Sequence, residues 1–224
     1  MLQLSELCSE QIGPSGFEFT PSGHLKLKTK KFPWSVVQRE FEYLYRTIVD
    51  NNLTRGFEAC TGVGISGLAV GLAMKQTGGK IVTLDAYIEE SLETPDYDGS
   101  EPVLNHNAVA FETVHALIAK YQLQNILVPV VGWTPDNVAE NIEANFTDKL
   151  DYVFIDGGHT PTQLIKDIAA VLPYTNNNTH WLFHDADTNV FDRQVAHFVN
   201  ENIGKKLRIV CPSSEGCNNL AILE

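Results

Sequence analysis

The sequence is poor in basic residues, and it contains no long apolar run. Lysine and arginine together number 16, against 28 aspartates and glutamates, which gives a net charge of -12. Because an acidic surface repels phosphate backbones, we expect no nucleic acid as its main substrate. No apolar stretch reaches the roughly 18 residues that a membrane helix needs, so we expect no membrane association either.

Cysteine is also scarce, and its spacing excludes a disulfide scaffold. Cys8, Cys60, Cys211 and Cys217 form neither a dense framework nor a CxxC pair, so reduced thiols are expected. The first sixteen residues lack the basic and apolar regions of a secretion signal. These features predict a cytoplasmic protein. With 224 residues, no internal repeat and 43% apolar content, the chain fits a single domain over residues 1–224.

What the sequence does contain is an alternation of strand and helix patterns. Residues 1–32 look irregular, and residues 1–34 are expected to form an N-terminal arm. A helix is predicted over residues 33–51, where apolar residues recur every three or four positions. Further helices are predicted at residues 66–75, 108–121, 135–145, 160–171 and 190–203. Strands are predicted at residues 56–60, 80–84, 126–131, 152–155, 180–183, 207–211 and 220–223.

This alternation predicts an α/β fold: a doubly wound, mostly parallel sheet with helices on both faces. Only eight residues separate the last two strands, which is too few for a helical crossover, so these strands should form an antiparallel hairpin. Ligands of such sheets bind outside the C-terminal ends of the strands. Glycine and polar residues follow all five earlier strands, which indicates a continuous site along that edge.

The residues after the first of these strands form a glycine-rich turn. Gly62-Val63-Gly64-Ile65-Ser66-Gly67 matches G-x-G-x-x-G, and Asp85 follows 18 residues after its last glycine. Glycines let a ligand approach the backbone, and an acid at the end of the second strand can accept hydrogen bonds from ribose hydroxyls. The pattern indicates an adenosine-type cofactor without specifying which one. The glycines could also serve only close helix–strand packing.

Three segments together resemble one known family. Glu58-Ala59-Cys60-Thr61-Gly62-Val63-Gly64 resembles motif I of class I S-adenosylmethionine-dependent methyltransferases. Residues 152–159 resemble the FIDG-x-H signature of a small-molecule O-methyltransferase group, and residues 181–185 resemble that group's fifth strand, which ends in His-Asp. The resemblance covers about residues 35–224. It implies a seven-stranded Rossmann-like methyltransferase fold ending in the antiparallel hairpin, and methyl transfer to a small-molecule hydroxyl.

The resemblance also implies a cofactor site for S-adenosylmethionine. Its residues would be Glu58, Cys60, Gly62, Gly64, Ser66, Asp85, Ala86, Gly132, Trp133 and Asp156. Glu58 would lie near the methionine ammonium or hold the motif I loop, and Asp85 would bind the ribose. Cys60 stands where the family has a glycine, so its thiol would crowd the cofactor. Trp133 could stack on the adenine, or it could be a core or lid residue.

For catalysis, the resemblance points to Asp156, His159, His184 and Asp185. In metal-dependent relatives, acids at these strand ends bind Mg²⁺, which implies Asp156 and Asp185 here, with Asp187, His159 or His184 as a third group. Such a metal would lower the pKa of a substrate hydroxyl. Without it, one of these histidines would be the general base. Structural alternatives are a capping Asp156 and a buried, hydrogen-bonded His184.

Residues 86–106 form an acidic insertion without lysine or arginine. The insertion follows the cofactor end of a strand, so it could be a lid that favours a cationic or polar acceptor, or a solvated loop. Two other functions are also compatible with the sequence. The literal G-x-G-x-x-G would suit an NAD(P)-linked oxidoreductase, and Cys60 would suit a non-catalytic cofactor-binding relative. A homo-oligomer is compatible with the sequence, which does not set the oligomeric state.

Overall fold

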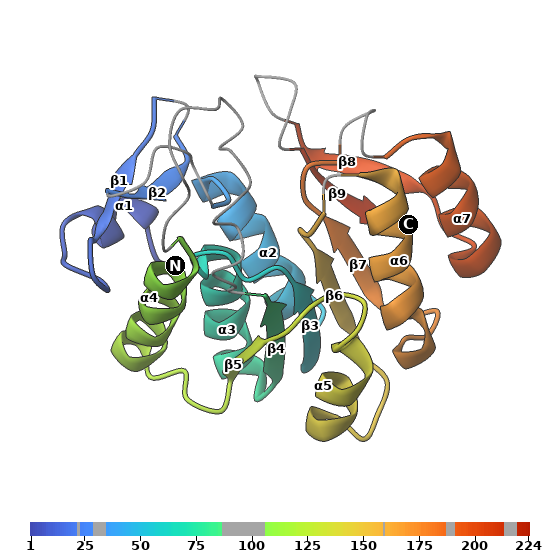
Figure 1. The fold of residues 1–224 in the computed structure, drawn as a ribbon, viewed down its shortest axis with the longest axis horizontal. Coiled ribbons are helices and arrows are strands. Elements are labelled where there is room, and N and C mark those ends of the chain that lie inside the picture. The colour runs from blue at the N-terminus through green and yellow to red at the C-terminus, as the bar shows by residue number, and fades with distance from the viewer. Residues whose placement is uncertain (22, 29–34, 87–105, 159, 187–190, 213–218) are drawn as a thin grey trace.

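The centre of the molecule is a seven-stranded sheet (Figure 1). The computed structural model describes residues 1–21, 23–28, 35–86, 106–158, 160–186, 191–212 and 219–224. The sheet has the order β5-β4-β3-β6-β7-β9-β8. Its strands are β3 (Arg55–Ala59), β4 (Lys80–Asp85), β5 (Leu127–Val131), β6 (Tyr152–Ile155), β7 (His180–Phe183), β8 (Leu207–Cys211) and β9 (Leu220–Leu223).

The pairing of these strands confirms the predicted topology. The first five strands of this sheet run parallel to one another, whereas β9 pairs antiparallel with both β7 and β8. The order reverses between β3 and β6, because the chain first builds outward through β4 and β5 and then returns. In open α/β sheets, this switch point is where the strand ends leave a crevice for a ligand.

Helices cover both faces of the sheet, as the alternation predicted (Figure 1). One face carries α2 (Gln38–Asp50), α3 (Ile65–Thr77) and α4 (His106–Tyr121), and the other carries α5 (Val138–Asn145), α6 (Pro161–Val171) and α7 (Arg193–Ile203). Each face has its own apolar core. The short 3₁₀ helix η2 (Leu172–Tyr174) follows α6. The central helix α3 has apolar residues all round, which fits its burial against α2 and the sheet.

The N-terminal segment is not irregular, and here the sequence-based expectation was wrong. It forms a short helix, α1 (Leu4–Cys8), and an antiparallel pair of strands, β1 (Phe17–Phe19) and β2 (Leu25–Leu27). Leu4, Phe17 and Leu25 are fully buried and belong to the core that α2 and α3 share. Elements of three to five residues are too short to show a periodic pattern, so only the tertiary contacts stabilise them.

Helix α2 begins at Gln38, five residues later than the sequence predicted. Residues 35–37 are instead held beside β2. Val37 bridges to His24 in antiparallel fashion, and the hydroxyl of Ser35 donates to the carbonyl of Leu25 at 2.5 Å. These contacts fix an extended backbone where the apolar spacing alone suggested helix. The earlier part of the predicted helix, at residues 33 and 34, lies outside the described residues.

Two other helices also start later than predicted. Helix α5 begins at Val138 because residues 133–137 form a turn, in which Asn137 Oδ1 accepts from the backbone N–H of Trp133 at 2.8 Å. Helix α7 begins at Arg193 because Asp192 caps it, accepting from the backbone N–H groups of the next turn. By contrast, α6 begins as predicted, with Thr160 accepting from the backbone of Gln163 at 3.2 Å.

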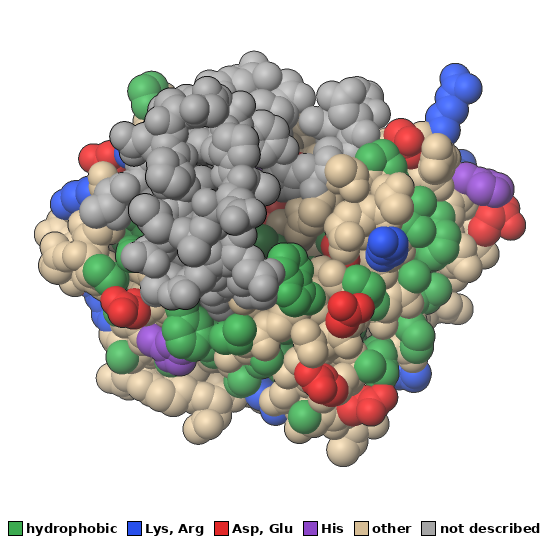
Figure 2. Space-filling view, viewed as in Figure 1, with side chains coloured by type: hydrophobic (Ala, Val, Ile, Leu, Met, Phe, Trp, Pro, Cys, Tyr) green, Lys and Arg blue, Asp and Glu red, His purple; other side chains and the backbone are tan. Residues whose placement is uncertain are grey.

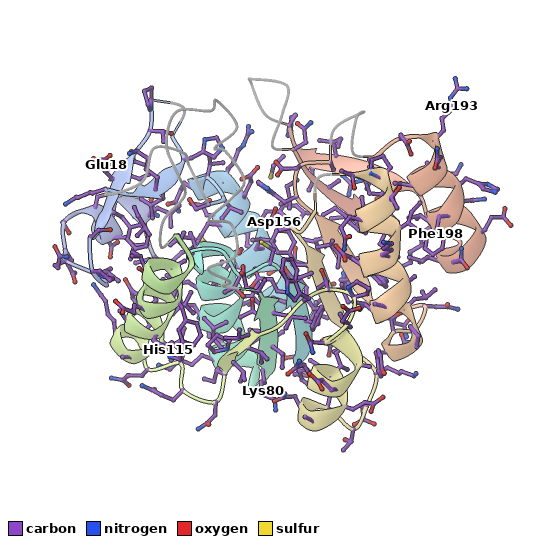
Figure 3. All side chains as sticks on the ribbon, viewed as in Figure 1. Glu18, Lys80, His115, Asp156, Arg193 and Phe198 are labelled. Atoms are coloured by element: carbon purple, nitrogen blue, oxygen red, sulfur yellow. The ribbon has the colours of Figure 1, made fainter. Side chains whose placement is uncertain are left out.

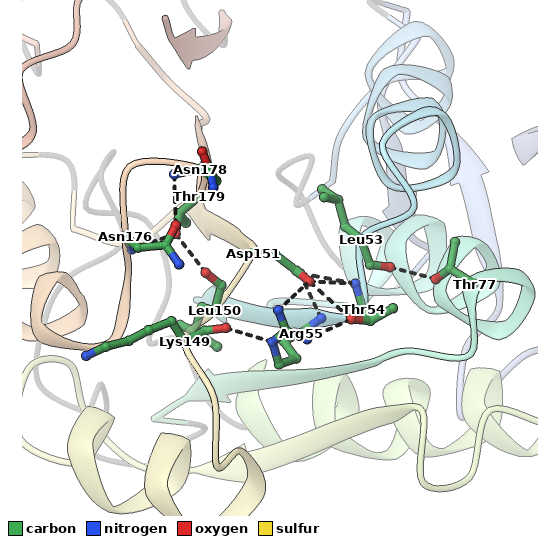
Figure 4. A network of polar contacts seen from close by, with 10 residues as sticks. All are labelled: Leu53, Thr54, Arg55, Thr77, Lys149, Leu150, Asp151, Asn176, Asn178 and Thr179. Atoms are coloured by element: carbon green, nitrogen blue, oxygen red, sulfur yellow. Dashed lines mark hydrogen bonds and ion pairs between the residues drawn. The ribbon is translucent and has the colours of Figure 1, made fainter.

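The N-terminal edge of the sheet is tied together by Asp151 (Figure 4). Its carboxylate accepts from the backbone N–H of Thr54 at 3.0 Å and from that of Arg55 at 2.8 Å, and it pairs with the Arg55 guanidinium at 3.3 Å. One side chain thereby joins the start of β3 to the start of β6. Asp151 therefore has a structural role at this edge, whereas ligands of open α/β sheets bind at the opposite edge, outside the C-terminal ends of the strands.

Figure 2 shows Lys and Arg side chains scattered singly over the described part of one face, with acidic side chains spread among apolar ones. In the described part of the chain, no helix has the length and apolarity to cross a membrane. Residues 87–105 of the acidic insertion, and Cys217, lie outside the described residues, so the predicted lid stays a prediction. Cys8, Cys60 and Cys211 are free thiols.

Candidate active site

The predicted site residues that the structure describes gather at the C-terminal edge of the sheet. In Figure 3, Asp156 lies near the middle of the molecule, beyond the end of β6, and Lys80 marks the opposite edge where β4 begins. The turn after β3, the end of β4, the loop after β5 and the ends of β6 and β7 therefore lie on the same side. The site has two parts, a glycine-rich turn and a cluster of acids around one histidine.

The glycine-rich turn links β3 to α3 through left-handed backbone. Gly62 has φ 51° and Gly64 has φ 81°, and Gly64 is the N-cap of α3. A Cβ at Gly64 would lie 2.8 Å from a methyl carbon of Val114, so both conformation and space require glycine there. The turn ends in the N-terminus of a buried helix, whose backbone N–H groups favour polar or anionic ligand groups.

Asp85 joins this turn to the end of β4. Its Oδ2 accepts from the backbone N–H of Gly62 at 2.9 Å, and the thiol of Cys60 lies 3.6 Å from the same oxygen. Cys60 has φ 74°, a conformation that costs a side-chain-bearing residue about 1–2 kcal/mol. Burial and the nearby charge of Asp85 raise the pKa of the Cys60 thiol well above its usual value, so the sulfur stays protonated and can donate to Asp85.

Glu58 is fully buried behind the turn. Its Oε1 accepts from the Ser66 hydroxyl at 2.5 Å, which fixes the first turn of α3, and a Cβ at Gly67 would lie 3.1 Å from Oε2. Burial raises the pKa of Glu58 to about 8, although hydrogen bonds from Ser66 and Thr83 oppose that shift. The geometry supports the expectation that Glu58 holds the motif I loop, and its carboxyl is mostly protonated at pH 7.

The loop after β5 completes the cofactor side of the site. Gly132 donates its N–H to the carbonyl of Asp85 at 2.9 Å, and Ala86 follows Asp85 in a half-buried position. A Cβ at Gly132 would meet Asn137 at 2.8 Å, so this glycine serves the turn before α5. Trp133 is 53% exposed, which excludes the core interpretation and leaves its ring accessible beside the strand ends.

The second part of the site is a cluster of acids around the His184 ring. His184 Nδ1 lies 3.2 Å from Asp156 Oδ1 and 3.4 Å from Asp185 Oδ1. The side chain of His184 is 8% exposed and that of Asp156 is 24% exposed. The Phe154 ring packs edge-on against the imidazole, with centroids 6.4 Å apart. Asp156 is thus the member of the cluster most open to a substrate. His159 and Asp187 lie outside the described residues.

The acids determine the charge of the imidazole. Burial lowers the pKa of His184, but the charge of Asp156 and hydrogen bonds to Asp156, Asp185 and Glu40 outweigh burial and raise that pKa well above the usual value. With carboxylates facing both nitrogens, the ring is an imidazolium that donates from both. In that state His184 has no lone pair with which to accept a proton.

The same cluster offers ligand atoms for a divalent cation. One ligand atom each from Asp156, His184 and Asp185 can be chosen so that all lie within 4.8 Å of one another. Two carboxylates suit Mg²⁺, and an added imidazole suits Mn²⁺ or Zn²⁺ equally well. The residues therefore fit a divalent metal. Of the three residues proposed as the third ligand, His184 is the one that the structure describes. To bind the metal, its Nδ1 would have to lose its proton.

Glu40 joins the cluster from α2, although it was not among the residues predicted from the sequence. Its Oε2 lies 3.4 Å from His184 Nε2, and the residue is 1% exposed. A signal was available, because Glu40 lies three residues after Val37 and four before Leu44, within the apolar stripe of the predicted helix. A carboxylate in a buried stripe needs a partner, but the sequence does not reveal that the partner follows β7.

The comparisons with known proteins identify the family. A family model described as a methyltransferase domain matches residues 58–186, which is more than half of the chain. The chain belongs to this methyltransferase-domain family. The matched segment begins at Glu58 in motif I and ends just after Asp185, so it contains the glycine-rich turn and the acid cluster apart from Glu40. This family assignment favours methyl transfer over the NAD(P)-linked alternative. No curated protein matches the chain at a significant level.

Solved structures of methyltransferases share the fold. The O-methyltransferase of Bacillus cereus, in complex with S-adenosylhomocysteine, is 14% identical, with 84% of this chain and 81% of that chain covered and a TM-score of 0.60. TomG of Streptomyces achromogenes, an O-methyltransferase of tomaymycin synthesis in complex with S-adenosylmethionine, is 14% identical, with 85% and 81% covered and a TM-score of 0.61.

A third structure shows that the fold is not tied to one acceptor. The precorrin-6y C5,15-methyltransferase of Geobacter metallireducens is 12% identical, with 88% of this chain and 94% of that chain covered and a TM-score of 0.61. These likenesses confirm the predicted Rossmann-like methyltransferase fold. At such low identity, they leave the acceptor and the individual site residues to be argued from this chain's own geometry.

Proposed function

We propose that the chain transfers the methyl group of S-adenosylmethionine to a hydroxyl oxygen of a small molecule. The observation that carries the proposal is the position of Asp85, whose carboxylate is anchored on the Gly62 N–H at 2.9 Å at the edge of the sheet where cofactors bind. The methyltransferase family and the cofactors named for two structural neighbours support this assignment.

In this proposal, the cofactor lies across the ends of β3, β4 and β5. Asp85 accepts from the ribose hydroxyls, while the Gly62 N–H keeps its carboxylate oriented. The exposed ring of Trp133 stacks on the adenine, an interaction worth about 1–3 kcal/mol for bases on aromatic side chains. Glu58 lies behind the turn, so its buried carboxyl acts on the methionine end through the loop that it holds.

The acceptor hydroxyl is proposed to lie beside Asp156, the most exposed acid of the His184 cluster. Its oxygen attacks the methyl carbon, a C–O bond forms, and the C–S bond breaks to leave neutral S-adenosylhomocysteine. The oxygen becomes acidic as it gains the methyl group, so a carboxylate is basic enough to take its proton. The protein supplies alignment of the two reactants and exclusion of water, which are the main demands of this reaction.

Asp156, His184 and Asp185 would hold a divalent metal if one is used. Such a metal would supply a fixed positive charge that lowers the pKa of the acceptor hydroxyl. A small-molecule acceptor, as opposed to a macromolecule, is proposed from the acidic composition and from the neighbours' names. The acidic insertion at residues 86–106, acting as a lid, would favour a cationic or polar acceptor.

The proposal is tested by methyl transfer from radiolabelled S-adenosylmethionine to a panel of hydroxyl, amine and thiol acceptors, with and without Mg²⁺ or Mn²⁺. Product formed only with hydroxyl acceptors supports it. Labelling of amines or thiols alone would place the chain in another acceptor class. Asp156→Asn should abolish transfer while cofactor binding survives, because an amide at this position cannot take the hydroxyl proton.

A second candidate is a cofactor-binding relative without turnover, which one observation favours. Cys60 puts a side chain where the family's motif has glycine, and its sulfur lies 3.6 Å from the proposed ribose ligand. If this candidate is correct, S-adenosylmethionine binds and every acceptor in the panel stays unlabelled. Restoring the glycine in Cys60→Gly would then leave turnover absent, because binding was never the missing step.

A further inference from the structure

The contact between Glu40 and His184 joins two parts of the chain that are 144 residues apart in sequence. Glu40 lies in the first turn of α2, outside the family-matched segment. His184 lies just beyond β7 and faces Asp156 and Asp185 with its other nitrogen. The ring is therefore held at both ends, by Glu40 on Nε2 and by the two aspartates on Nδ1.

This arrangement determines which way the imidazole points. Nε2 is in a buried setting, and Glu40 Oε2 at 3.4 Å is the acceptor that the structure gives it. Without a carboxylate there, a buried N–H would lose its partner, which is costly away from water. The ring could reduce this cost by turning away, and Nδ1 would then leave Asp156. A His that is oriented by a carboxylate on its second nitrogen is a common device of reactive sites.

We propose that Glu40 is a positioning residue of the candidate active site, which fixes the His184 ring so that Nδ1 stays against Asp156. The inference rests on the proposed function for its catalytic meaning, because Asp156 is the acid placed beside the acceptor. Glu40 itself contacts neither cofactor nor acceptor in this account. It acts through His184, so its loss disorders the acid cluster and leaves the glycine-rich turn intact.

Glu40 also has a purely structural contact, which is distinct from its contact with His184. Its Oε2 accepts from the backbone N–H of Val37 at 2.9 Å, as a third-position acid does at a helix N-terminus. Val37 in turn bridges to His24. A glutamine at position 40 can keep both contacts through its amide oxygen, whereas leucine keeps neither. The two substitutions therefore have different expected effects on the His184 ring.

The test is NMR spectroscopy of the histidine ring nitrogens in the 224-residue chain, at one pH and with S-adenosylhomocysteine added. His184→Asn assigns the His184 signals. We expect a slowly exchanging Nε2–H in the wild-type protein, its retention with a changed chemical shift in Glu40→Gln, and its loss in Glu40→Leu. Glu42→Gln is the matched control, because it removes a charge from the same helix and Glu42 accepts a hydrogen bond from the side chain of Gln38. The His184 signals should not change in this variant.

Two results would overturn the proposal. One is an unchanged His184 spectrum in Glu40→Leu. The other is the same disturbance in Glu42→Gln, which would make any effect a general one of α2. Thermal unfolding shows whether Glu40→Leu is folded. If it is not, the test is the chemical shift of the His184 Nε2–H in Glu40→Gln, which should differ from that of the wild type. Calorimetric titration with S-adenosylmethionine separates the two proposals, because absent binding in the wild-type protein refutes the proposed function while the ring spectra still report on Glu40.

Discussion

Asp151 and Asp156 flank the same strand, β6, and their carboxylates have different contacts at opposite edges of the sheet. Asp151 is surrounded by donors from Thr54 and Arg55, whereas Asp156 faces the buried ring of His184 and remains partly exposed. A four-residue strand thus separates an acid that holds the fold from one that is available for chemistry.

This contrast predicts that the same substitution, Asp to Asn, affects stability at Asp151 and methyl transfer at Asp156. Asp151→Asn removes the charge that two backbone N–H groups and Arg55 share, so the free energy of unfolding should fall by about 2 kcal/mol. Affinity for S-adenosylmethionine should change little. Asp156→Asn should lose methyl transfer with a smaller loss of stability. Urea unfolding measures the free energy of unfolding, and calorimetry measures the affinity for S-adenosylmethionine. If both variants lost stability and activity to the same extent, Asp151 and Asp156 would not have the separate roles assigned to them.

Cys60 gives a second prediction. Cys60→Gly removes a side chain from left-handed backbone and frees Asp85 Oδ2 of the thiol. We expect S-adenosylmethionine to bind several-fold more tightly, with stability unchanged or up to about 1 kcal/mol higher, since the greater freedom of glycine in the unfolded chain offsets the relief of strain.

Cys60→Ala is the control for that experiment, because it removes the thiol and keeps the left-handed strain. Tighter binding in both variants would assign the effect to the thiol, and tighter binding in the glycine variant alone would assign it to the backbone. Weaker binding in both would mean that Cys60 contributes to the cofactor site.

Glu58 predicts how stability depends on pH. Its pKa is about 8 in the folded protein, against 4.5 for the ordinary group, so the folded state binds the proton more tightly. Stability from this residue is present at low pH and is lost as the pH rises from about 4.5 to 8. The upper bound of the loss is roughly 4–5 kcal/mol, at 1.36 kcal/mol per pKa unit.

Glu58→Gln should therefore flatten the pH dependence of the melting temperature between pH 5 and 9, and it should be more stable than the wild type at the alkaline end. The amide keeps an acceptor for Ser66. If the melting temperatures of the two proteins changed with pH in the same way across this range, Glu58 would be ionised in the folded state and paired with a compensating charge.

Gly64, in the glycine-rich turn, can be compared with Gly78, at the other end of α3. Both have left-handed backbone, with φ 81° and φ 74°, but a Cβ at Gly64 would lie 2.8 Å from Val114, while Gly78 has open space. Gly78→Ala should cost about 1 kcal/mol of stability. Gly64→Ala should cost about 2 kcal/mol more and weaken S-adenosylmethionine binding. Equal costs would mean that Val114 moves aside.

The central and C-terminal strands could be predicted closely from the sequence. The bounds of β6, β7, β8 and β9 are those expected, since each is a short apolar run between polar turns. The hairpin of the last two strands followed from the length of their connection. These features are local. The order of the strands in the sheet was not predicted from the sequence and is known from the structure.

Contacts between distant segments could not be predicted in the same way. The start of α2 depends on Ser35 and Val37 binding the β2 segment, and the N-terminal elements are stable only because Leu4 and Phe17 reach a shared core. Within the site, Asp156 and His184 were predicted from strand ends. Glu40 was missed, because its role depends on α2 lying against the end of β7.

The most direct measurement is calorimetric titration of the 224-residue chain with S-adenosylmethionine, with NAD as the comparison and Asp85→Asn as the matched variant. We expect S-adenosylmethionine to bind at one site per chain, at least tenfold more weakly in Asp85→Asn, and NAD to give no heat of binding. Binding of NAD in place of S-adenosylmethionine, or equal affinity in the wild type and Asp85→Asn, would contradict the cofactor site proposed at the end of β4.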